Sequence, residues 1–222
     1  MPNVKPPAGA GTAALNSVGV EVVEQAPARD LEVRARIVDS ARRCFRRNGV
    51  AKTRIAAVAA EAGMVRQTVY DFVESRAHLL ELAMAARMSE LGGAVNERFH
   101  PEGDIVEDLV ELTAVMTEVM SSDPECTELA TGMTPRNAMR FISSPDSEAQ
   151  PVVVGILAPI YERAGEAGLL QPGLSIEDMA AWLRSACAPL SQRDDMTPDE
   201  LRTIIRRFLV PVFLTDRSRD GS

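Results

Sequence analysis

The sequence predicts an all-α fold, and three observations support this prediction. Aromatic residues make up only 4% of the chain while alanine and leucine are abundant, a composition that favours helices over strands. Apolar residues recur at spacings of three and four, and no segment alternates convincingly with a period of two. Glycines, prolines and capping residues fall between the periodic segments, where helices end and begin. About nine helices of ordinary length fit this pattern.

Length and composition limit the class of protein. The 222 residues suffice for a small domain joined to a larger one. We expect no membrane association, because no run of about 18 apolar residues is present. We also expect no secretory signal, because the sequence lacks a charged start followed by an apolar stretch. Cys44, Cys126 and Cys187 form neither a disulfide framework nor a metal motif. We therefore expect a reduced, cytoplasmic protein without a cofactor, in which Cys126, in a predicted loop, is the one candidate reactive thiol.

Charge is unevenly distributed along the chain, whose net charge is −8. Residues 31–80 contain ten Lys and Arg against five Asp and Glu, a net of +5. Residues 81–222 contain twelve against twenty-four, a net of −12. Only nearby charges act on a phosphate backbone in salt, so a basic module on an acidic body is typical of nucleic-acid binding. The alternative is a chance cluster of charges on a solvated face.

The pattern divides the chain into three parts. Residues 1–29, rich in Pro, Gly and Ala, are predicted to be a disordered tail. Residues 77–222 are predicted to form a helical bundle, entered by a helix over residues 76–99 that Ser75 caps. Between them, residues 30–76 form a small domain of three helices, predicted at residues 31–48, 53–62 and 66–72.

The second and third of these helices have helix-turn-helix spacing. Gly63 permits positive φ in the turn, and the small Ala59 and Ala62 allow the two helices to cross closely. In such a motif the second helix lies in the major groove, with its first residues facing base edges.

This segment resembles the DNA-binding domain of the TetR family of bacterial transcriptional regulators, over residues 31–80. The most specific part of the resemblance is the combination of Ala62-Gly63, Thr68-Val69-Tyr70 and Ser75-Arg76. Further matching positions, at the spacing of the family, are Ile37, Ala41, Phe45, Gly49, Thr53, Ile55, Ala56, Ala59, Phe72 and Leu79-Leu80. The resemblance implies a DNA-binding domain followed by a ligand-binding and dimerisation bundle, and a regulator, not an enzyme.

The resemblance also implies roles for individual side chains. Arg66 and Gln67 are candidates for reading base edges. The candidates for phosphate contact are Thr53, Thr68, Tyr70 and Arg76. Arg54 is a further DNA-binding candidate, because it adds charge at the start of the second helix. The alternatives are a core role for Tyr70, a solvated charge for Arg66 and a purely N-capping role for Thr53.

The recognition helix departs from the family pattern in three places. Val65 stands where a small hydroxyl residue usually caps the helix, and a missing side-chain cap costs about 1 kcal/mol. Gln67 replaces a small residue and can pair with adenine. Asp71 places an acid next to DNA. We therefore expect the docking mode of the family with an individual operator.

The acidic part contains five further predicted helices, at residues 104–121, 135–142, 147–168, 175–192 and 197–214. Thr197, Pro198 and Glu200 form a capping box at the start of the last one. The last two helices carry apolar stripes, which predict the interface of a homodimer. The stripes are Met179, Trp182, Leu183, Ala186 and Leu190, and Leu201, Ile204, Ile205, Phe208, Leu209 and Val212.

Six residues of this part are candidates for lining an apolar effector pocket, and methionine suits such adaptable sites. They are Met116, Met120, Met139, Phe141, Leu157 and Tyr161. The alternative is that they belong to an ordinary core.

These observations predict a repressor that binds a pseudo-palindromic double-stranded DNA operator as a dimer and is released by a small molecule. The identity of that effector does not follow from the sequence. One alternative is a small-molecule-binding helical protein or enzyme whose N-terminal helices serve only for packing. Another is an activator, which sequence does not separate from a repressor.

Overall fold

The computed structural model describes residues 18–193 and 195–215, and the side chains of residues 28–193 and 195–215. The chain divides into two units, residues 1–36 and 37–222. The first helix, α1 (Val18–Asn48), begins well before the predicted start at Leu31. This corrects the predicted tail from Val18 onward, whereas residues 1–17 lie outside the described residues. Extending an existing helix is far easier than nucleating one, so a segment with a weak pattern continues the helix that follows it.

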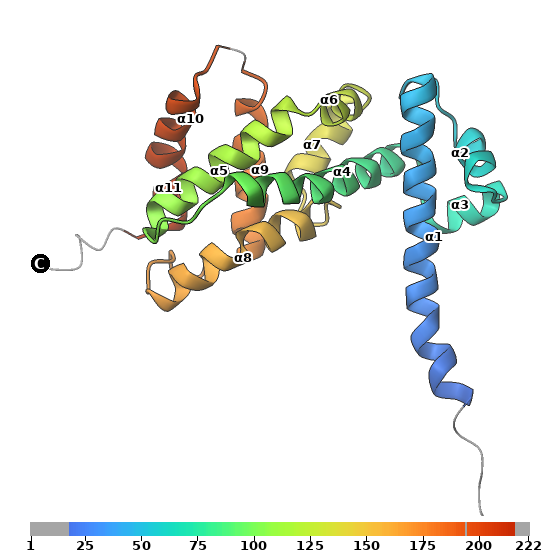
Figure 1. The fold of residues 1–222 in the computed structure, drawn as a ribbon, viewed down its shortest axis with the longest axis horizontal. Coiled ribbons are helices and arrows are strands. Elements are labelled where there is room, and N and C mark those ends of the chain that lie inside the picture. The colour runs from blue at the N-terminus through green and yellow to red at the C-terminus, as the bar shows by residue number, and fades with distance from the viewer. Residues whose placement is uncertain (1–17, 194, 216–222) are drawn as a thin grey trace, which may run out of the picture. The chain divides into compact units, whose positions relative to one another are not determined.

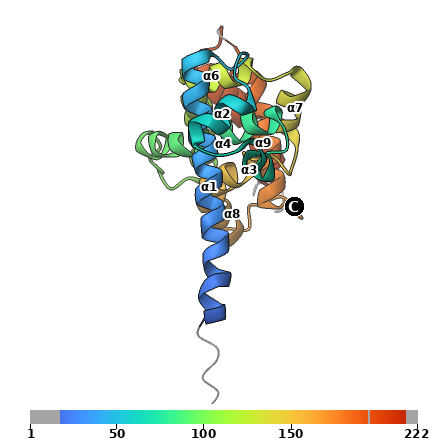
Figure 2. The same cartoon turned by 90° about the vertical axis from the view of Figure 1, so that its right-hand side faces the viewer.

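The N-terminal module, defined here as α1 from Ile37 onward with α2 (Ile55–Ala62) and α3 (Arg66–Phe72), has the predicted helices (Figure 2). Gly63 ends α2 with φ of 65°, the left-handed conformation that glycine adopts without strain. The apolar faces of the three helices are buried, the residues involved being Ile37, Ala41, Cys44, Phe45, Ile55, Val58, Ala59, Ala62 and Val69.

The remainder of the chain forms a helical bundle, coloured from green to red in Figure 1. Its helices are α4 (Arg76–Arg98), α5 (Ile105–Ser122), α6 (Pro124–Thr131), α7 (Pro135–Ser143), α8 (Gln150–Glu166), α9 (Ile176–Leu190), α10 (Pro198–Ile204), η1 (Ile205–Leu209) and α11 (Val210–Phe213). The described residues contain no strand, only an isolated bridge between Leu170 and Leu214, so the all-α prediction is confirmed. None of the described helices has the length and apolar content needed to cross a bilayer.

The core of the bundle lies between α5, α8, α9 and the last helical stretch. Leu109, Leu157, Met179 and Ile205, one from each of these elements, are at most 1% exposed. The predicted capping box at Thr197 and Glu200 is present. The predicted last helix changes to π-helical geometry over Ile205–Leu209. The next turn contains Pro211, which has no N–H to donate and whose ring crowds the carbonyl four residues earlier.

Helix α6 was not predicted, and it replaces the loop expected around Cys126. The Asp123 carboxylate accepts a hydrogen bond from the Cys126 backbone N–H at 2.8 Å, and Pro124 follows in the first turn. Cys126 is buried on this helix, and burial raises the pKa of its thiol to about 12. The interpretation of Cys126 as a reactive thiol is therefore wrong, because a reactive cysteine needs exposure and a lowered pKa.

The end of α6 lies directly against the N-terminal module. A Cβ atom placed on Gly132, the C-cap of α6, would overlap Val50 Cγ1 and lie 3.0 Å from Val50 Cβ. Val50 is buried in the turn between α1 and α2. A side chain at position 132 is thus excluded by the close approach of the two parts of the chain.

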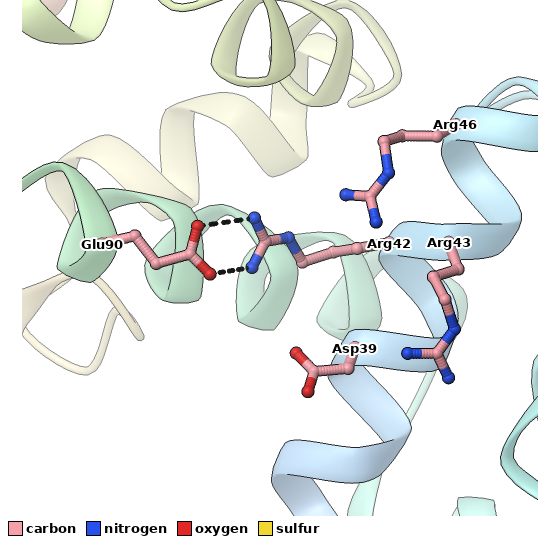
Figure 3. A pocket seen from close by; sticks show the side chains of 5 residues that line it. All are labelled: Asp39, Arg42, Arg43, Arg46 and Glu90. Carbon is pink, nitrogen blue, oxygen red and sulfur yellow. Dashed lines mark hydrogen bonds and ion pairs between the residues drawn. The ribbon is translucent and has the colours of Figure 1, made fainter.

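An ion-pair network joins the module to the bundle a short distance away. Arg42 of α1 is 7% exposed, and its Nε donates to Glu125 of α6 at 2.6 Å. Its Nη2 donates to Glu90 of α4 at 2.8 Å, while Nη1 pairs with the other oxygen of that carboxylate (Figure 3). Arg87 of α4 extends the network to Glu90 at 2.9 Å and to Asp123 at 2.6 Å.

A small charged pocket of about 230 Å³ adjoins this network, and Figure 3 shows its lining. Besides Arg42 and Glu90 it is lined by Asp39, Arg43 and Arg46, all from α1. The boundary between the two parts of the chain is thus polar and rich in arginine, which distinguishes it from the apolar core of the bundle.

Gly132→Ala tests the close approach of α6 to the module. We expect a loss of about 1–3 kcal/mol in the free energy of unfolding, because the added methyl group overpacks against Val50. Chemical denaturation measures this loss. The matched control is Gly155→Ala on α8, where a Cβ meets nothing within 4 Å and helix propensity predicts a gain of about 1 kcal/mol. Equal stability of Gly132→Ala and the unaltered protein would contradict the contact.

The network also predicts the acid sensitivity of the fold. Hydrogen bonds from Arg42 lower the pKa of Glu90 to about 2, and those from Arg87 lower the pKa of Asp123 to about 2. A carboxylate whose pKa is lower in the folded than in the unfolded state stabilises the fold at pH values above its ordinary pKa. This contribution is lost as the pH falls toward the lowered pKa. We expect the free energy of unfolding to fall between about pH 5 and about pH 2.

Urea denaturation at several pH values measures this dependence. The double variant Glu90→Gln/Asp123→Asn is expected to be less stable at pH 6 and to lose less stability on acidification. Glu166→Gln, which removes an exposed carboxylate at the end of α8, is the control. An unchanged pH profile in the double variant would show that the network does not link protonation to folding.

Candidate nucleic-acid interface

The candidate interface is built on α3. The apolar side of this helix is buried against its neighbours, and this packing holds the helix in place. Val69 is fully buried and Val73, directly after the helix, is 1% exposed. The N–H groups of Gly63 and Met64 donate to carbonyls of α2, at 3.2 Å to Ala60 and 2.9 Å to Ala59. These contacts close the turn and fix the direction in which α3 leaves it.

The opposite face of α3 is turned to solvent. Arg66, Gln67, Tyr70 and Asp71 are all exposed, and Thr68 is half-buried. Tyr70 is 43% exposed, so the alternative of a core aromatic is wrong. Polar and aromatic side chains thus occupy the surface that a major groove would meet.

Contacts within this face order its longest side chains. The Arg66 guanidinium lies over the Tyr70 ring, 5.9 Å from its centre, which is within the range of cation–π attraction. Gln67 Nε2 donates to Asp71 Oδ1 at 3.1 Å, one turn further along. Asp71 therefore orients the Gln67 amide and lowers the local excess of positive charge.

The start of α3 has the predicted defect. Val65 is the N-cap residue, it is 70% exposed, and no side chain caps the helix. The free N–H groups of the first turn are thus presented next to Arg66, where a phosphate oxygen is a suitable acceptor.

Two predicted phosphate contacts need correction. The Thr53 side chain is buried, and its hydroxyl donates to the carbonyls of Cys44 at 3.2 Å and Gly49 at 3.0 Å. Arg54, not Thr53, is the N-cap of α2, and no side chain caps it. Arg76 donates to the backbone carbonyls of Thr53, at 3.3 Å, and Val50. Both side chains position the turn before α2, because their polar atoms are already engaged in it.

The free positive charge of the module is smaller than its sequence indicated. Arg43 and Arg47 both pair with Glu61 at 3.0 Å, and Arg42 is buried in its ion pairs. Arg54 and Arg66 are exposed, and neither has an acidic partner among the described residues. These two arginines, with the side chains of α3, make up the candidate interface.

The predicted pocket residues lie in different environments. Met116 of α5, Leu157 of α8 and Phe141 of α7 are buried, while Met120 is half-buried. The half-buried Tyr161 donates its hydroxyl to the Leu174 carbonyl at 2.8 Å. Met139 is 63% exposed on α7, so its assignment to an interior pocket is wrong. Met139 and Phe141 are two positions apart on this short helix and therefore lie on different faces of it, so that one is exposed and the other is buried.

Sequence reasoning missed the residues that connect the two parts of the chain, Glu90, Glu125 and Gly132. The pair Asp123-Pro124 is a typical helix start, an N-cap followed by proline at the first helical position. That signal identifies α6, although it does not indicate where α6 packs.

Comparisons with known proteins agree with this fold. Residues 37–83 match the family model of bacterial regulatory proteins, tetR family. The R. erythropolis transcriptional repressor QsdR, from the TetR family, is 21% identical with a TM-score of 0.60, over 80% of this chain and 93% of its own. The comparison with curated proteins gave no match.

Two further solved structures share the fold. The TetR family repressor AlkX from Dietzia sp. is 19% identical with a TM-score of 0.54, over 80% of this chain and 93% of its own. RolR, solved in complex with resorcinol, is 18% identical with a TM-score of 0.55, over 84% of this chain and 90% of its own.

The fold and the match over residues 37–83 identify the N-terminal module as the helix-turn-helix domain of a DNA-binding transcription regulator. The predicted resemblance of the N-terminal domain to the tetR family of bacterial regulatory proteins is confirmed over residues 37–83. The matched model describes regulatory proteins, which agrees with the predicted role as a regulator and not an enzyme.

Val65→Ser tests the missing cap at the start of α3. A serine hydroxyl at this position accepts from the free N–H groups, and we expect a gain of about 1 kcal/mol in the free energy of unfolding. Thermal or chemical denaturation measures it. Val65→Ala, which removes the exposed valine without adding an acceptor, is the control. If both variants were equally stable, the first turn of α3 would not be lacking a cap.

Proposed function

We propose that this protein is a repressor that binds a pseudo-palindromic operator as a homodimer and is released when a small molecule occupies the bundle. The observation that carries this proposal is the exposed set Arg66, Gln67 and Tyr70 on a helix whose other face is buried. Arg66 and Gln67 are the base-reading side chains. Tyr70, Thr68 and Arg54 contact phosphates, which fix the register of the helix on the duplex. Such a protein acts in the cytoplasm, where bacterial DNA is found.

Exposed apolar residues on the last helices support dimerisation. Trp182 of α9 is 58% exposed, Phe208 of η1 is 60% exposed and Val212 of α11 is 44% exposed. Other members of the predicted stripes, such as Met179 and Ile205, are fully buried within the chain. The stripes thus serve two purposes, since one edge packs the bundle and the other remains for a partner. Large exposed aromatic residues of this kind are typical of protein interfaces.

A homodimer explains why we propose an operator with pseudo-palindromic symmetry. A two-fold axis relates two copies of α3, so the operator repeats with inverted symmetry at a spacing of about one turn of DNA. A change in the separation of the two copies weakens binding at both half-sites together.

The Arg42 network supports a route from bundle to operator. It joins α1 to α4 and α6 through buried or half-buried ion pairs. A shift of either bundle helix must therefore move the module or break pairs that hold a buried cation. An effector acts only through different affinities for the two arrangements, and release by 100-fold needs about 2.7 kcal/mol of coupling.

DNA binding by the full chain to the region upstream of its own gene tests the proposal. We expect Arg66→Ala/Tyr70→Phe to weaken binding by at least about 30-fold, because each lost contact is worth about 1–3 kcal/mol. The melting temperature should stay unchanged, because both side chains are exposed. Arg136→Ala removes an exposed arginine from α7 and should keep the affinity. Binding of the unaltered protein no tighter than to random duplex would refute specific repression.

A further inference from the structure

A buried arginine in the bundle has no acidic partner. Arg184 of α9 is 7% exposed, and its Nη2 donates to the Ser144 carbonyl at 2.9 Å. Its Nε and Nη1 atoms are buried and make no hydrogen bond. Among the described residues no carboxylate pairs with it, whereas the buried Arg42 meets two.

A contribution to the stability of the bundle does not explain why an unpaired arginine is buried at position 184. An unpaired buried cation is among the most unfavourable groups in a protein interior, and an apolar side chain of similar size is usually at least as stable there. Burial also lowers the pKa of Arg184, the direction expected when nothing offsets the loss of hydration. Strain of this kind is commonly retained where a ligand relieves it.

Within residues 28–193 and 195–215, the other buried polar atoms without a hydrogen bond belong to helices that pack against α9. They are Thr113 Oγ1 on α5 and Gln150 Oε1 on α8, and α5, α8 and α9 contact one another pairwise. Gln150 Nε2 donates to the Glu177 carbonyl of α9 at 2.8 Å. Glu177 lies about two turns before Arg184 along α9.

A second contact ties the polar faces of α5 and α9 together. Burial raises the pKa of the Cys187 thiol to about 11, and the neighbouring Thr117 hydroxyl opposes this rise. Thr117 is one turn from Thr113, and Cys187 is about one turn from Arg184. Helices α5 and α9 thus meet at Thr117 and Cys187, each within about one turn of a residue that carries an unpartnered atom.

The orientation of α9 places Arg184 away from the proposed dimer surface. Trp182 is exposed, whereas Leu183, Arg184 and Cys187 are buried. Positions 182 and 184 point about 200° apart around a helix. Arg184 thus faces the interior of its own chain, and the exposed face of α9 is left for a partner.

The free atoms of Arg184 indicate the chemistry of a ligand. Nη2 carries two N–H groups, and the Ser144 carbonyl uses one. The other lies parallel to an N–H of either Nε or Nη1, so one complete two-pronged donor fork remains. Such a fork matches the two oxygens of a carboxylate.

The surroundings indicate the remainder of the ligand. Met116, Leu157 and Leu183 are buried on the same three helices. They provide apolar contact for a hydrocarbon body, as in most small-molecule sites. The Gln150 oxygen and the Thr113 hydroxyl, on α8 and α5, are further groups able to form hydrogen bonds with a polar substituent.

We propose that Arg184 is the anion-binding residue of the effector site and that the effector is a small monocarboxylic acid with an apolar body. This inference rests on the proposed function, because only a regulator has an effector, but binding of the acid to the site can be tested without DNA. The carboxylate would occupy the free fork of Arg184, and its body would lie between α5, α8 and α9.

The experiment uses the full-length protein and a series of carboxylates as probes, straight-chain acids from butanoate to dodecanoate together with benzoate. Calorimetric binding and thermal melting are measured for each acid and for its uncharged primary amide. We expect at least one acid to bind and to raise the melting temperature, while its amide binds at least about 10-fold more weakly. If no acid in the series binds better than its amide, the proposal is overturned.

Two variants separate a binding role from a structural one. Arg184→Met is expected to melt at the same temperature as the unaltered protein or higher without ligand, and to bind the acid about 10- to 100-fold more weakly. Arg136→Met removes an exposed arginine of α7 and should change neither property. A lower melting temperature for Arg184→Met with undiminished acid binding would show that Arg184 only caps Ser144.

Adding the same acids to the DNA-binding experiment distinguishes failure of this proposal from failure of the proposed function. Binding of the acid at Arg184 without any effect on an operator complex would retain the site and overturn release by this effector. Specific operator binding with no response to any carboxylate in either experiment would retain DNA recognition and overturn the site. Acid binding that survives in Arg184→Met would place the ligand elsewhere and overturn the proposal.

Discussion

The pairing of Arg42 with Glu90 and Glu125 is the constraint on which the arrangement of the DNA-binding module and the bundle depends. Arg42 is 7% exposed, and a buried guanidinium is tolerated only while its partners stay in place. These partners come from α4 and α6, so one side chain of α1 fixes two bundle helices at once. The close approach of Gly132 to Val50 reinforces the same boundary. Regulation by the bundle must act through these contacts, because they join it to the module.

Arg42 is buried at the boundary between module and bundle, and Arg184 is buried inside the bundle. The two arginines differ in a way that bears on regulation. Arg42 is fully paired, whereas Arg184 keeps a free donor fork. The first is suited to hold an arrangement and the second to accept a ligand. Helix α5 packs on both α9 and α6, so a contiguous set of contacts runs from the proposed effector site to the Arg42 network. Such continuity is a physical condition for coupling, and the coupling itself is measured as a difference in ligand affinity between two states.

Sequence reasoning succeeded where local chemistry decides the structure. The bounds of α3, the turn at Gly63 and the uncapped Val65 depend on residues a few positions apart, and all were predicted. It failed where a residue has two plausible local roles. Thr53 fits an N-cap, yet its hydroxyl donates to carbonyls at the end of α1. Arg76 fits a phosphate contact, yet it donates to the turn before α2. A donor takes whichever acceptor the fold brings close, and the sequence does not give that distance.

The sequence by itself determined the helical class, the helix-turn-helix motif and the excess of acidic charge in the bundle, because periodicity, turn residues and composition act over short stretches of chain. The tertiary structure decided which charges stay free and which polar groups are buried. It neutralised Arg43 and Arg47 with Glu61 and left Arg184 without a partner. Pairing and burial depend on contacts between residues distant in the chain, and only the packing of the helices creates those contacts.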